Sequence, residues 1–259
     1  MDAERFETIL WARDGASATL TLNRPESRNG VTAVMMDELY RVLCAAAKDE
    51  SLKVLVLRGA GRDFCPGADV KAYAGGSGGR TAMEAFNVAV LLHEMPAVTI
   101  AAIKGACAGA GLGWAAACDF RYADESARFN TAFLNVGLAG DMGGPWTLSR
   151  ILGGAKAREL YMLAEKFDAA EALRIGLITR QFAAGTFEAD LAALVERLKD
   201  AAPLALRTLK ANFIAAEQMG FSEFVAFEAQ RHSALFASRD TQEAFAAFVE
   251  KRKPVFEGR

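Results

Sequence analysis

The sequence is poor in the residues that build metal centres. It contains two histidines and four cysteines in 259 residues, and no pair of cysteines has the CxxC spacing that zinc sites use. The histidines, His93 and His232, are far apart in the chain. We therefore expect no bound metal, and we expect the cysteines to be free thiols in a reducing compartment. The four are Cys44, Cys65, Cys107 and Cys118.

The sequence also lacks an excess of charge of either sign. Lys and Arg number 30 against 32 Asp and Glu, so the formal net charge is −2. No basic excess of the kind that nucleic-acid partners require is present. The 52% hydrophobic and 24% charged content is typical of a folded globular protein. An anionic ligand must therefore be met by local cations.

No long apolar run is present either. The most apolar region, residues 96–118, consists largely of alanine and includes Lys104 and four glycines, so it does not predict a membrane span. The first residues carry acidic side chains early and lack the basic segment and apolar stretch of a secretory signal. We expect a cytoplasmic protein without a membrane partner.

Short β-rich runs alternate with helical segments over most of the chain. The residues 32–48 place Val34, Leu39 and Val42 on one apolar stripe opposite Asp37 and Glu38, as in an amphipathic helix. Strands alternating with helices predict an α/β core. The β-rich runs, each bounded by Gly, Pro or polar residues, are residues 17–25, 53–59, 97–105, 119–124 and 176–182.

Beyond about residue 187 the pattern indicates helices only. The last helix carries Phe245, Phe248 and Val249, which is more apolar surface than a small appendage can bury alone. We predict an α/β core of residues 1–197 that holds the site and a helical oligomerisation unit of residues 198–259. The expected helices cover residues 188–201, 204–219 and 221–252, the last with a break near 238–240.

Two motifs formally match other classes of enzyme. GGSGG at 75–79 fits GxSxG, and Ser77, Asp141 and His232 follow the order of a hydrolase triad. A nucleophile elbow needs a strand before it and a helix after it, so we interpret these residues as a flexible loop. GAGLG at 109–113 begins like a dinucleotide fingerprint, but Trp114 stands where the final glycine is required.

Two glycine-containing turns have the pattern of an anion site. RDFCPGADVKAY at 62–73 and GAGLG at 109–113 each set a strand against a tight turn and then a helix. The N–H groups at the start of such a helix have no partner within it and point outward. Two such turns brought together would bind an anionic oxygen.

With these motifs the chain resembles the crotonase (enoyl-CoA hydratase/isomerase) superfamily over nearly its full length. The resemblance implies a ββα spiral core with a C-terminal helical unit, an acyl-CoA substrate and assembly as a homotrimer or a dimer of trimers. Coenzyme A would enter as part of the substrate, and no separate cofactor is expected. The matching motifs are LNRPESRNG at 22–30, FCPGADVKAY at 64–73, IAAIKGACAGAGLGWAAACDFRYA at 100–123, FNTAFLNVGLAGDMGG at 129–144, AEALRIGLI at 170–178 and FVEKRKPVF at 248–256.

The resemblance assigns two backbone amides to the anion site. In the family one oxyanion amide precedes the aspartate of the GAD turn, which is Ala68 here, and the other lies in the middle of the glycine triplet, which is Ala110. These donors would favour the thioester oxygen as it gains charge in an enolate. Removing one such donor from other enzymes raises the activation barrier by roughly 2.7–4 kcal/mol.

The acid and base residues differ from those of true hydratases. Hydratases of the family resemble one another in two glutamates, and the corresponding positions here are Gly113 and Phe133. Adding water requires groups that activate it and deliver a proton. Asp141 occupies the turn where dienoyl-CoA isomerases and 1,2-epoxyphenylacetyl-CoA isomerases carry an aspartate. We therefore expect isomerisation of an enoyl-CoA or ring-epoxide acyl-CoA, with Asp141 as base and then acid.

Other roles for Asp141 stay open. It could be a turn or helix-cap residue, or a nucleophile in an acyl-CoA hydrolase or dehalogenase. Hydration without the two glutamates and acyl-CoA binding without catalysis are further alternatives. Proton shuttling near neutral pH would require an apolar site that raises the pKa of the carboxyl group. Candidates for its wall are Phe133, Leu138, Met142 and Trp146.

The resemblance also implies contacts with coenzyme A. The adenine is expected near the backbone of Pro66, Ala68 and Val70. Cations for the phosphates are expected from Arg24, Arg28 and Lys71. Phe248 and Lys251 would reach coenzyme A from the C-terminal unit, often across a subunit boundary. We expect His93 and His232 to be packed or surface residues, and Cys65 and Cys107 to be small buried fillers.

Overall fold

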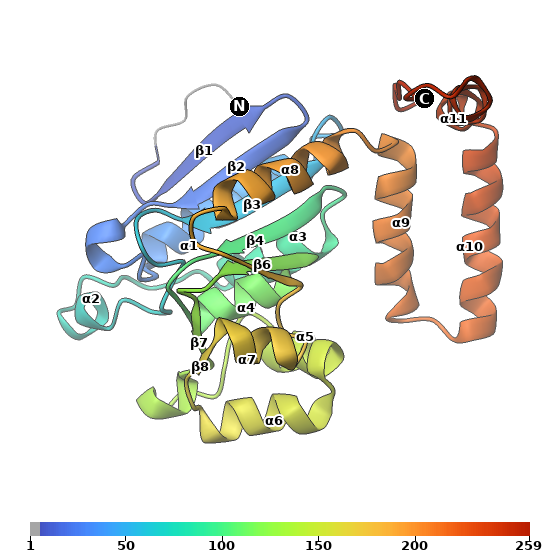
Figure 1. Ribbon diagram of the computed structural model, residues 1–259. Coiled ribbons are helices and arrows are strands. Elements are labelled where there is room, and N and C mark those ends of the chain that lie inside the picture. The colour runs from blue at the N-terminus through green and yellow to red at the C-terminus, as the bar shows by residue number, and fades with distance from the viewer. Residues whose placement is uncertain (1–5) are drawn as a thin grey trace.

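The computed structural model describes residues 6–259 and shows a twisted sheet enclosed by helices (Figure 1). The main sheet has six strands in the order β1-β2-β3-β4-β6-β9. The first pair is antiparallel and the other neighbours are parallel. The strands are β1 (Ile9–Asp14), β2 (Ser17–Leu22), β3 (Val54–Gly59), β4 (Val98–Ile103), β6 (Phe120–Asp124) and β9 (Arg180–Phe182).

A second, smaller sheet lies at the carboxyl end of the first. It has the order β5-β7-β8, in which β5 and β7 are parallel and β7 and β8 antiparallel. An isolated parallel bridge between Cys65 and Cys107 connects the chain after β3 to β5. This connection holds the segment after β3 against the segment that leads into α4. The strands are β5 (Ala106–Ala108), β7 (Arg128–Asn130) and β8 (Phe167–Asp168).

The central strands are apolar on both faces because helices cover both. Leu55 and Leu57 of β3 pack in one cluster with residues of α1, α3 and α4. The alternate residues Val54 and Val56 pack in a second cluster with Phe187 of α8. Such strands read as continuous apolar runs, as parallel sheets require. The covering helices are α1 (Ala33–Ala46), α3 (Val88–Glu94), α4 (Ala110–Ala117) and α8 (Phe187–Lys199).

Shorter helices connect these elements along the chain. Among residues 6–259, no helix combines the length and apolar content needed to cross a bilayer. The α-helices here are α2 (Val70–Ala74), α5 (Gly144–Leu152), α6 (Gly154–Leu163) and α7 (Ala169–Arg174). The 3-10 helices are η1 (Pro25–Ser27), η2 (Met83–Asn87) and η3 (Phe133–Val136).

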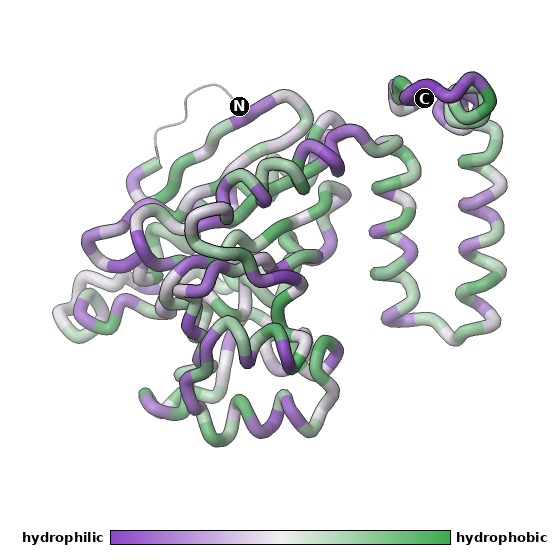
Figure 2. The backbone as a smooth tube through the Cα atoms, viewed as in Figure 1, coloured by the Kyte–Doolittle hydropathy of each residue, from purple (hydrophilic) through white to green (hydrophobic). Residues whose placement is uncertain are grey.

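The last three helices stand beside the sheet core. Figure 1 shows α9 (Pro203–Ala216) and α10 (Phe221–Phe236) as an antiparallel pair, with α11 (Arg239–Glu250) at its outer end. Apolar residues are distributed along all three helices in Figure 2. The predicted unit boundary at 197/198 falls in the last turn of α8, a helix that packs on the sheet. The division into two units stays a prediction.

Most of the expected elements are confirmed, including the helix break near 238–240, where α10 ends and α11 begins. The predicted run 176–182 forms a strand only from Arg180, because Gly176 takes a positive φ of 81° in the preceding turn. Two assignments on α1 were wrong. Val34 is 44% exposed, whereas Glu38 is buried and accepts a hydrogen bond from the Thr8 amide at 2.9 Å. The unpredicted strand β1 supplies that partner, since Thr8 immediately precedes it.

Candidate functional site

The turn after β3 and the turn before α4 lie in direct contact. Gly67 and Gly109 both have positive φ, 98° and 52°. A Cβ atom added to Gly67 would lie 3.5 Å from the Cα atom of Gly109. A Cβ atom added to Gly111 would lie 2.4 Å from the carbonyl oxygen of Cys65, so no side chain fits there without movement. Glycine therefore permits the close approach of the two turns.

Backbone hydrogen bonds fix the first turn around Ala68. Val31 donates to the Gly67 carbonyl and accepts from the Asp69 amide, both at 2.9 Å. Within residues 6–259, the Ala68 amide donates to no other backbone group, and the residue is exposed. Ala110 is the first residue of α4, so its amide has no partner within the helix. The predicted pair of donors thus lies on two touching turns, with Ala68 exposed and Ala110 buried at 5% exposure.

Asp69 and Arg24 stabilise this turn through a hydrogen bond and an ion pair. The Asp69 carboxylate accepts a hydrogen bond from the Ala72 amide at 3.0 Å and so caps α2. It also pairs with the Arg24 guanidinium at 2.9 Å. The hydrogen bond from Ala72 and the pairing with Arg24 lower the pKa of Asp69. Arg24, expected to meet phosphate, therefore has a structural partner within the chain.

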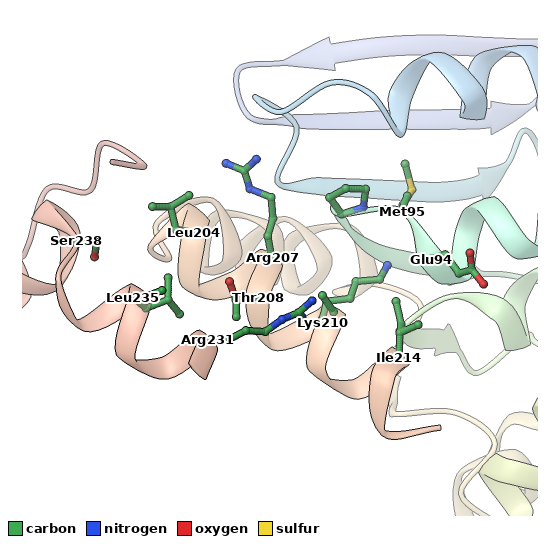
Figure 3. Close-up of a pocket in the computed structure, with 13 residues that line it drawn as sticks. Glu94, Met95, Leu204, Arg207, Thr208, Lys210, Ile214, Arg231, Leu235 and Ser238 are labelled. Carbon is green, nitrogen blue, oxygen red and sulfur yellow. The ribbon is translucent and has the colours of Figure 1, made fainter. Parts of the chain in front are cut away.

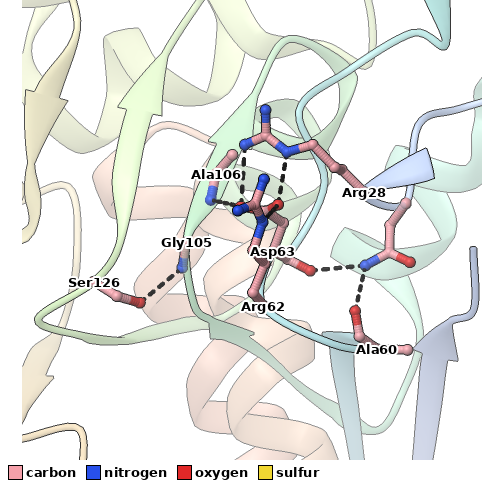
Figure 4. A network of polar contacts seen from close by, with 8 residues as sticks. Arg28, Ala60, Arg62, Asp63, Gly105, Ala106 and Ser126 are labelled. Carbon is pink, nitrogen blue, oxygen red and sulfur yellow. Dashed lines mark hydrogen bonds and ion pairs between the residues drawn. The ribbon is translucent and has the colours of Figure 1, made fainter. Parts of the chain in front are cut away.

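Arg28 is likewise engaged by a carboxylate (Figure 4). Its Nε and Nη2 atoms lie 2.7 and 3.2 Å from the two oxygens of Asp63. Asp63 also accepts from the Ala106 amide at 2.8 Å, which ties β5 to the turn after β3. The buried Asn29 donates to the carbonyls of Ala60 and Asp63. Sequence reasoning assigned no role to Asp63 or Asn29, because the bonds that join Asp63 to Arg28 and Ala106, and Asn29 to Ala60 and Asp63, span 31 or more residues.

The remaining residues expected to bind coenzyme A lie in two separate places. Pro66, Val70 and Lys71 surround the turn of Ala68, and Val70 is 60% exposed. Within residues 6–259, Lys71 makes no ion pair, so its ammonium group is available for phosphate. Phe248 and Lys251 belong to α11 and its C-terminal cap, and Figure 1 places α11 and α2 at opposite ends of the molecule. One chain does not bring them together, and a contribution from a second copy stays a prediction.

Asp141 has a desolvated carboxylate beside the two turns. Burial raises the pKa of Asp141 to about 6. Its Oδ1 atom is buried and has no hydrogen-bond partner within the described residues. Burial, and to a smaller extent the charge of Asp141, raises the pKa of the Cys65 thiol to about 12, which places Asp141 near the first turn. A carboxyl group with this pKa is largely ionised at pH 7 and gains its proton as the pH falls through about 6.

The two positions at which hydratases carry glutamate are filled by apolar packing. A Cβ atom added to Gly113 would lie 2.6 Å from the Cβ atom of Met142, so Met142 occupies the space above that position. Phe133 is 7% exposed and stacks on Tyr161, with ring centroids 6.2 Å apart. Met142 holds a positive φ of 50°, which is rare for a residue with a side chain. Neither position therefore places a carboxylate beside Asp141.

Tyr161 is a site residue that the sequence did not reveal. A Cβ atom on Gly144 would lie 1.8 Å from its hydroxyl oxygen, and one on Gly140 would lie 3.3 Å from its ring. The turn that carries Asp141 thus wraps around this ring. Burial and the nearby Asp141 charge raise the pKa of Tyr161, so its hydroxyl stays protonated. No motif marked it, because it lies on α6, twenty residues along the chain.

The proposed apolar wall is only partly formed by the predicted residues. Phe133 and Met142 are buried, as expected. Leu138 is 57% exposed, so its side chain lies mainly in solvent. Trp146 is 41% exposed and packs between the guanidinium of Arg150, 3.6 Å from the ring centroid, and the ring of His93. Of the four predicted wall residues, Phe133 and Met142 are therefore buried, and Tyr161 packs against the turn that carries Asp141.

The other candidate chemistry is not assembled. Ser77 donates to the Ala72 carbonyl near α2, whereas His232 lies on α10 at the other end of Figure 1. His93 contacts Glu217 at 3.0 Å. Cys65 and Cys107 are fully buried, as expected of fillers. No group of three or more metal-binding side chains occurs among residues 6–259.

Cavities lie between several of these elements. One, of about 540 Å³, lies between α9, α10 and the end of α3, and Figure 3 shows Arg207, Lys210 and Arg231 around it. Lys210 is engaged by Asp119 at 2.8 Å, and none of the predicted site residues lines this space. Two others flank the Asp141 turn. Phe133 and Tyr161 line one, of about 310 Å³, and Met142 lines the other, of about 250 Å³.

Comparison with known proteins identifies the family of this site. The family model for enoyl-CoA hydratase/isomerase matches residues 13–259. The chain belongs to the enoyl-CoA hydratase/isomerase family, the crotonase superfamily. A trans-2-decenoyl-[acyl-carrier-protein] isomerase of Streptococcus mutans is 31% identical over 98% of this chain and 99% of its own length.

Solved structures of the family share the fold. A Streptomyces coelicolor A3(2) protein assigned as an enoyl-CoA hydratase superposes with a TM-score of 0.93 at 34% identity, covering 100% of this chain and 97% of its own. A Thermobifida fusca YX relative, solved in complex with acetoacetyl-CoA, has a TM-score of 0.83 at 27% identity over 89% of this chain and 95% of its own. Names of isomerases and of hydratases both occur among the relatives. Membership of the family therefore shows that the chain is an acyl-CoA enzyme. It does not distinguish an isomerase from a hydratase.

Proposed function

We propose that the protein isomerises an acyl-CoA thioester through an enolate, with Asp141 as the single acid/base. The observation that carries this proposal is the buried, unpartnered Asp141 oxygen beside the turns of Ala68 and Ala110. Positions 113 and 133 hold Gly and Phe. The site therefore has a single carboxylate, whereas hydratases of the family have two glutamates. A single proton carrier suits a reaction that moves a proton and adds nothing.

The reaction follows from the placement of these groups. The Asp141 carboxylate removes a proton from the carbon next to the thioester carbonyl. The electron pair of that C–H bond passes to the carbonyl oxygen, and the amides of Ala68 and Ala110 stabilise the resulting negative charge. The protonated Asp141, whose proton can exchange with water, then delivers a proton to a carbon further along the conjugated chain, and the double bond shifts. No atom is gained or lost.

The pKa of Asp141 and the lack of a second carboxylate both favour isomerisation over hydration. A pKa near 6 places Asp141 close to neutral pH in both of its roles, which is where acid/base catalysis is most efficient. Hydration would need a second group to activate water, and the packing of Met142 and Phe133 leaves no carboxylate to do so. Coenzyme A would lie along Pro66 and Val70, with Lys71 available to its phosphates.

Hydrogen exchange and product analysis test this proposal. The protein is incubated in deuterated water with a panel of 2-enoyl- and 3-enoyl-CoA esters, and the isotope content and double-bond position are determined by mass spectrometry and NMR. We expect double-bond migration and no 3-hydroxyacyl-CoA. Asp141→Asn should lower the rate by about 10²–10⁴-fold. The control Asp37→Asn removes an exposed carboxylate on α1 and should leave the rate unchanged.

A second candidate uses the same carboxylate as a nucleophile. An unpartnered oxygen can also attack carbon, as in an acyl-CoA hydrolase or dehalogenase. Turnover in ¹⁸O-labelled water separates the two mechanisms, because a nucleophile incorporates the label into Asp141 and a proton shuttle does not. Formation of 3-hydroxyacyl-CoA would instead establish a hydratase, and binding of esters without exchange or turnover would establish a binding protein.

A further inference from the structure

We propose that the cavity behind Met142 binds the far end of the acyl group and selects tails that contain one six-membered ring over long linear chains. This inference rests on the proposed acyl-CoA site, because it specifies the substrate of that site. The cavity encloses about 250 Å³ between α3 and α5. Its lining residues are Ala89, Val90, His93, Glu94, Ala117, Met142, Gly143, Trp146 and Thr147.

The position of the cavity follows from the chain around Asp141. Met142 and Gly143 directly follow the carboxylate, and both line the cavity. Met142 packs over Gly113, and Ala117, one turn further along α4, lines the same cavity. Residues four apart on a helix lie on one face. A continuous face of α4 therefore leads from the oxyanion turn, past Met142, into this space.

The size and walls of the cavity favour a compact ring. A cavity of about 150 Å³ is sufficient to bind benzene, so about 250 Å³ accommodates a six-membered ring and a short linker. Ala117 and Gly143 leave room where larger side chains would close the space. Trp146 supplies an aromatic wall, on which Arg150 stacks, and His93 meets it edge to face with centroids 5.4 Å apart. Aromatic groups pack well against such a wall.

Charged groups limit the length of an occupant. His93 pairs with Glu217 at 3.0 Å, and Glu94 also lines the cavity. A long apolar chain that reaches the partly buried pair of His93 and Glu217 would remove it from water without replacing the lost hydrogen bonds, which is costly. A compact ring is too short to reach these charged groups and avoids this cost.

The alternative cavity behind Phe133 is less accessible from Asp141. It encloses about 310 Å³, but the stacked rings of Phe133 and Tyr161 form its wall on that side. The Tyr161 hydroxyl is wedged against Gly144, so the ring cannot move without the Asp141 turn. Met142 is a flexible, unbranched side chain that adjusts to an occupant at lower cost. The acyl group therefore enters the cavity of Met142.

Two matched substitutions test which cavity is used. Val90→Trp fills the cavity behind Met142, and Leu134→Trp fills the one behind Phe133; the two side chains are 46% and 52% exposed. Dissociation constants are measured by titration calorimetry for 3-phenylpropanoyl-, cyclohexylacetyl-, butanoyl- and dodecanoyl-CoA. We expect wild type to bind the ring esters at least about tenfold more tightly than dodecanoyl-CoA. Val90→Trp should weaken the binding of the ring esters about tenfold and leave the dissociation constant of butanoyl-CoA unchanged. Leu134→Trp should change the binding of neither class of ester.

Saturated esters keep this test separate from the proposed reaction. They need no turnover, and Asp141→Asn should bind them like wild type, so a wrong isomerase assignment would leave the binding pattern intact. Loss of ring-ester binding in Leu134→Trp alone, or dodecanoyl-CoA bound as tightly as the ring esters, would overturn the inference. Thermal unfolding checks both variants, and Val90→Phe is a smaller change of the same direction should Val90→Trp fail to fold.

Discussion

The carboxyl group of Asp141 opposes folding when it is ionised. Burial raises its pKa from 3.8 to about 6, so the folded chain retains this proton at pH values where the unfolded chain has lost it. The contribution to stability is therefore complete below about pH 4, declines as the pH rises to about 6 and stays level above that. In the proposed reaction this unfavourable charge serves as the catalytic base.

Asp141→Asn should therefore be more stable than wild type at neutral pH. We expect a gain of about 1–2 kcal/mol in the free energy of unfolding at pH 7.5, because the substitution removes a desolvated charge. Partial contact of this charge with solvent keeps the gain small. The gain should disappear below about pH 4. Urea unfolding of both proteins at several pH values measures it, and equal stability at pH 7.5 would show that the carboxylate carries no desolvation cost.

The rate of enolate formation should depend on the same ionisation. The base form of Asp141 is needed for proton removal, so kcat/KM should rise about tenfold per pH unit below the pKa near 6 and become constant above it. Deuterium exchange at the α-carbon between about pH 5 and pH 8 gives this profile. A flat profile in this range would assign proton removal to another group.

Gly111 is predicted to tolerate no side chain. The Cβ atom of Gly111→Ala would lie 2.4 Å from the Cys65 carbonyl oxygen, so the turns of Ala68 and Ala110 must separate. We expect a loss of about 1–3 kcal/mol in stability and a marked fall in kcat. Gly185→Ala is the control, since a Cβ atom there meets nothing within 4 Å. Thermal unfolding and turnover of both variants measure the effect, and an unchanged kcat in Gly111→Ala would contradict the close contact.

At the scale of elements, Asp63 joins segments that are distant in sequence. Its carboxylate accepts from Arg28 and from the Ala106 amide, and these bonds hold the turn after β3 against β5. Burial favours the neutral acid, but the hydrogen bonds from Arg28 and Ala106 lower the pKa of Asp63 overall. The ion pair positions the oxyanion turns from outside the site.

Asp63→Ala should therefore destabilise the chain by about 1–3 kcal/mol, because the Arg28 guanidinium and the Ala106 amide lose a buried acceptor. The control is Arg62→Ala, which removes a partner of the same carboxylate from a side chain that is 79% exposed; its effect should be within about 0.5 kcal/mol. Denaturant titrations compare the two variants. A similar loss in both would show that Asp63 acts only through surface charge.

Sequence patterns predicted elements well wherever local burial is one-sided or complete. The apolar runs of β3 and β4 and the periodicity of α9 to α11 are examples. β1 was missed, because most of its residues are exposed and its short apolar signal is weak. Glu38 was assigned to the polar face of α1, since nothing in the helix shows that Thr8 would pack above it. Local patterns cannot report partners that arrive from elsewhere.

At the scale of the whole molecule, the C-terminal helices present apolar surface to solvent. Phe213, Phe221 and Phe248 are 68, 85 and 84% exposed in the single chain. Large exposed apolar surface is typical of self-association. Together with the family resemblance, this supports the proposal that the chain forms trimers or dimers of trimers and that Phe248 and Lys251 reach coenzyme A bound to a second copy.

Phe213→Asp should weaken this association. The substitution places a charge on the apolar face of α9, whereas Leu163→Asp introduces the same charge at the end of α6, on a side chain that is 63% exposed. Light scattering coupled to size-exclusion chromatography should show a trimer or hexamer for wild type and Leu163→Asp, and smaller species for Phe213→Asp. A monomeric wild type would contradict the proposed assembly.

The sequence by itself determined the family, the alternation of strands and helices, the turns of Ala68 and Ala110, and the absence of glutamate at positions 113 and 133. These properties depend on residue identity and spacing along the chain. Only the tertiary structure decided that Arg24 and Arg28 are held by Asp69 and Asp63, that Tyr161 encloses the Asp141 turn, and that a cavity opens behind Met142. These depend on which distant segments meet, because burial and pairing are set by packing in three dimensions.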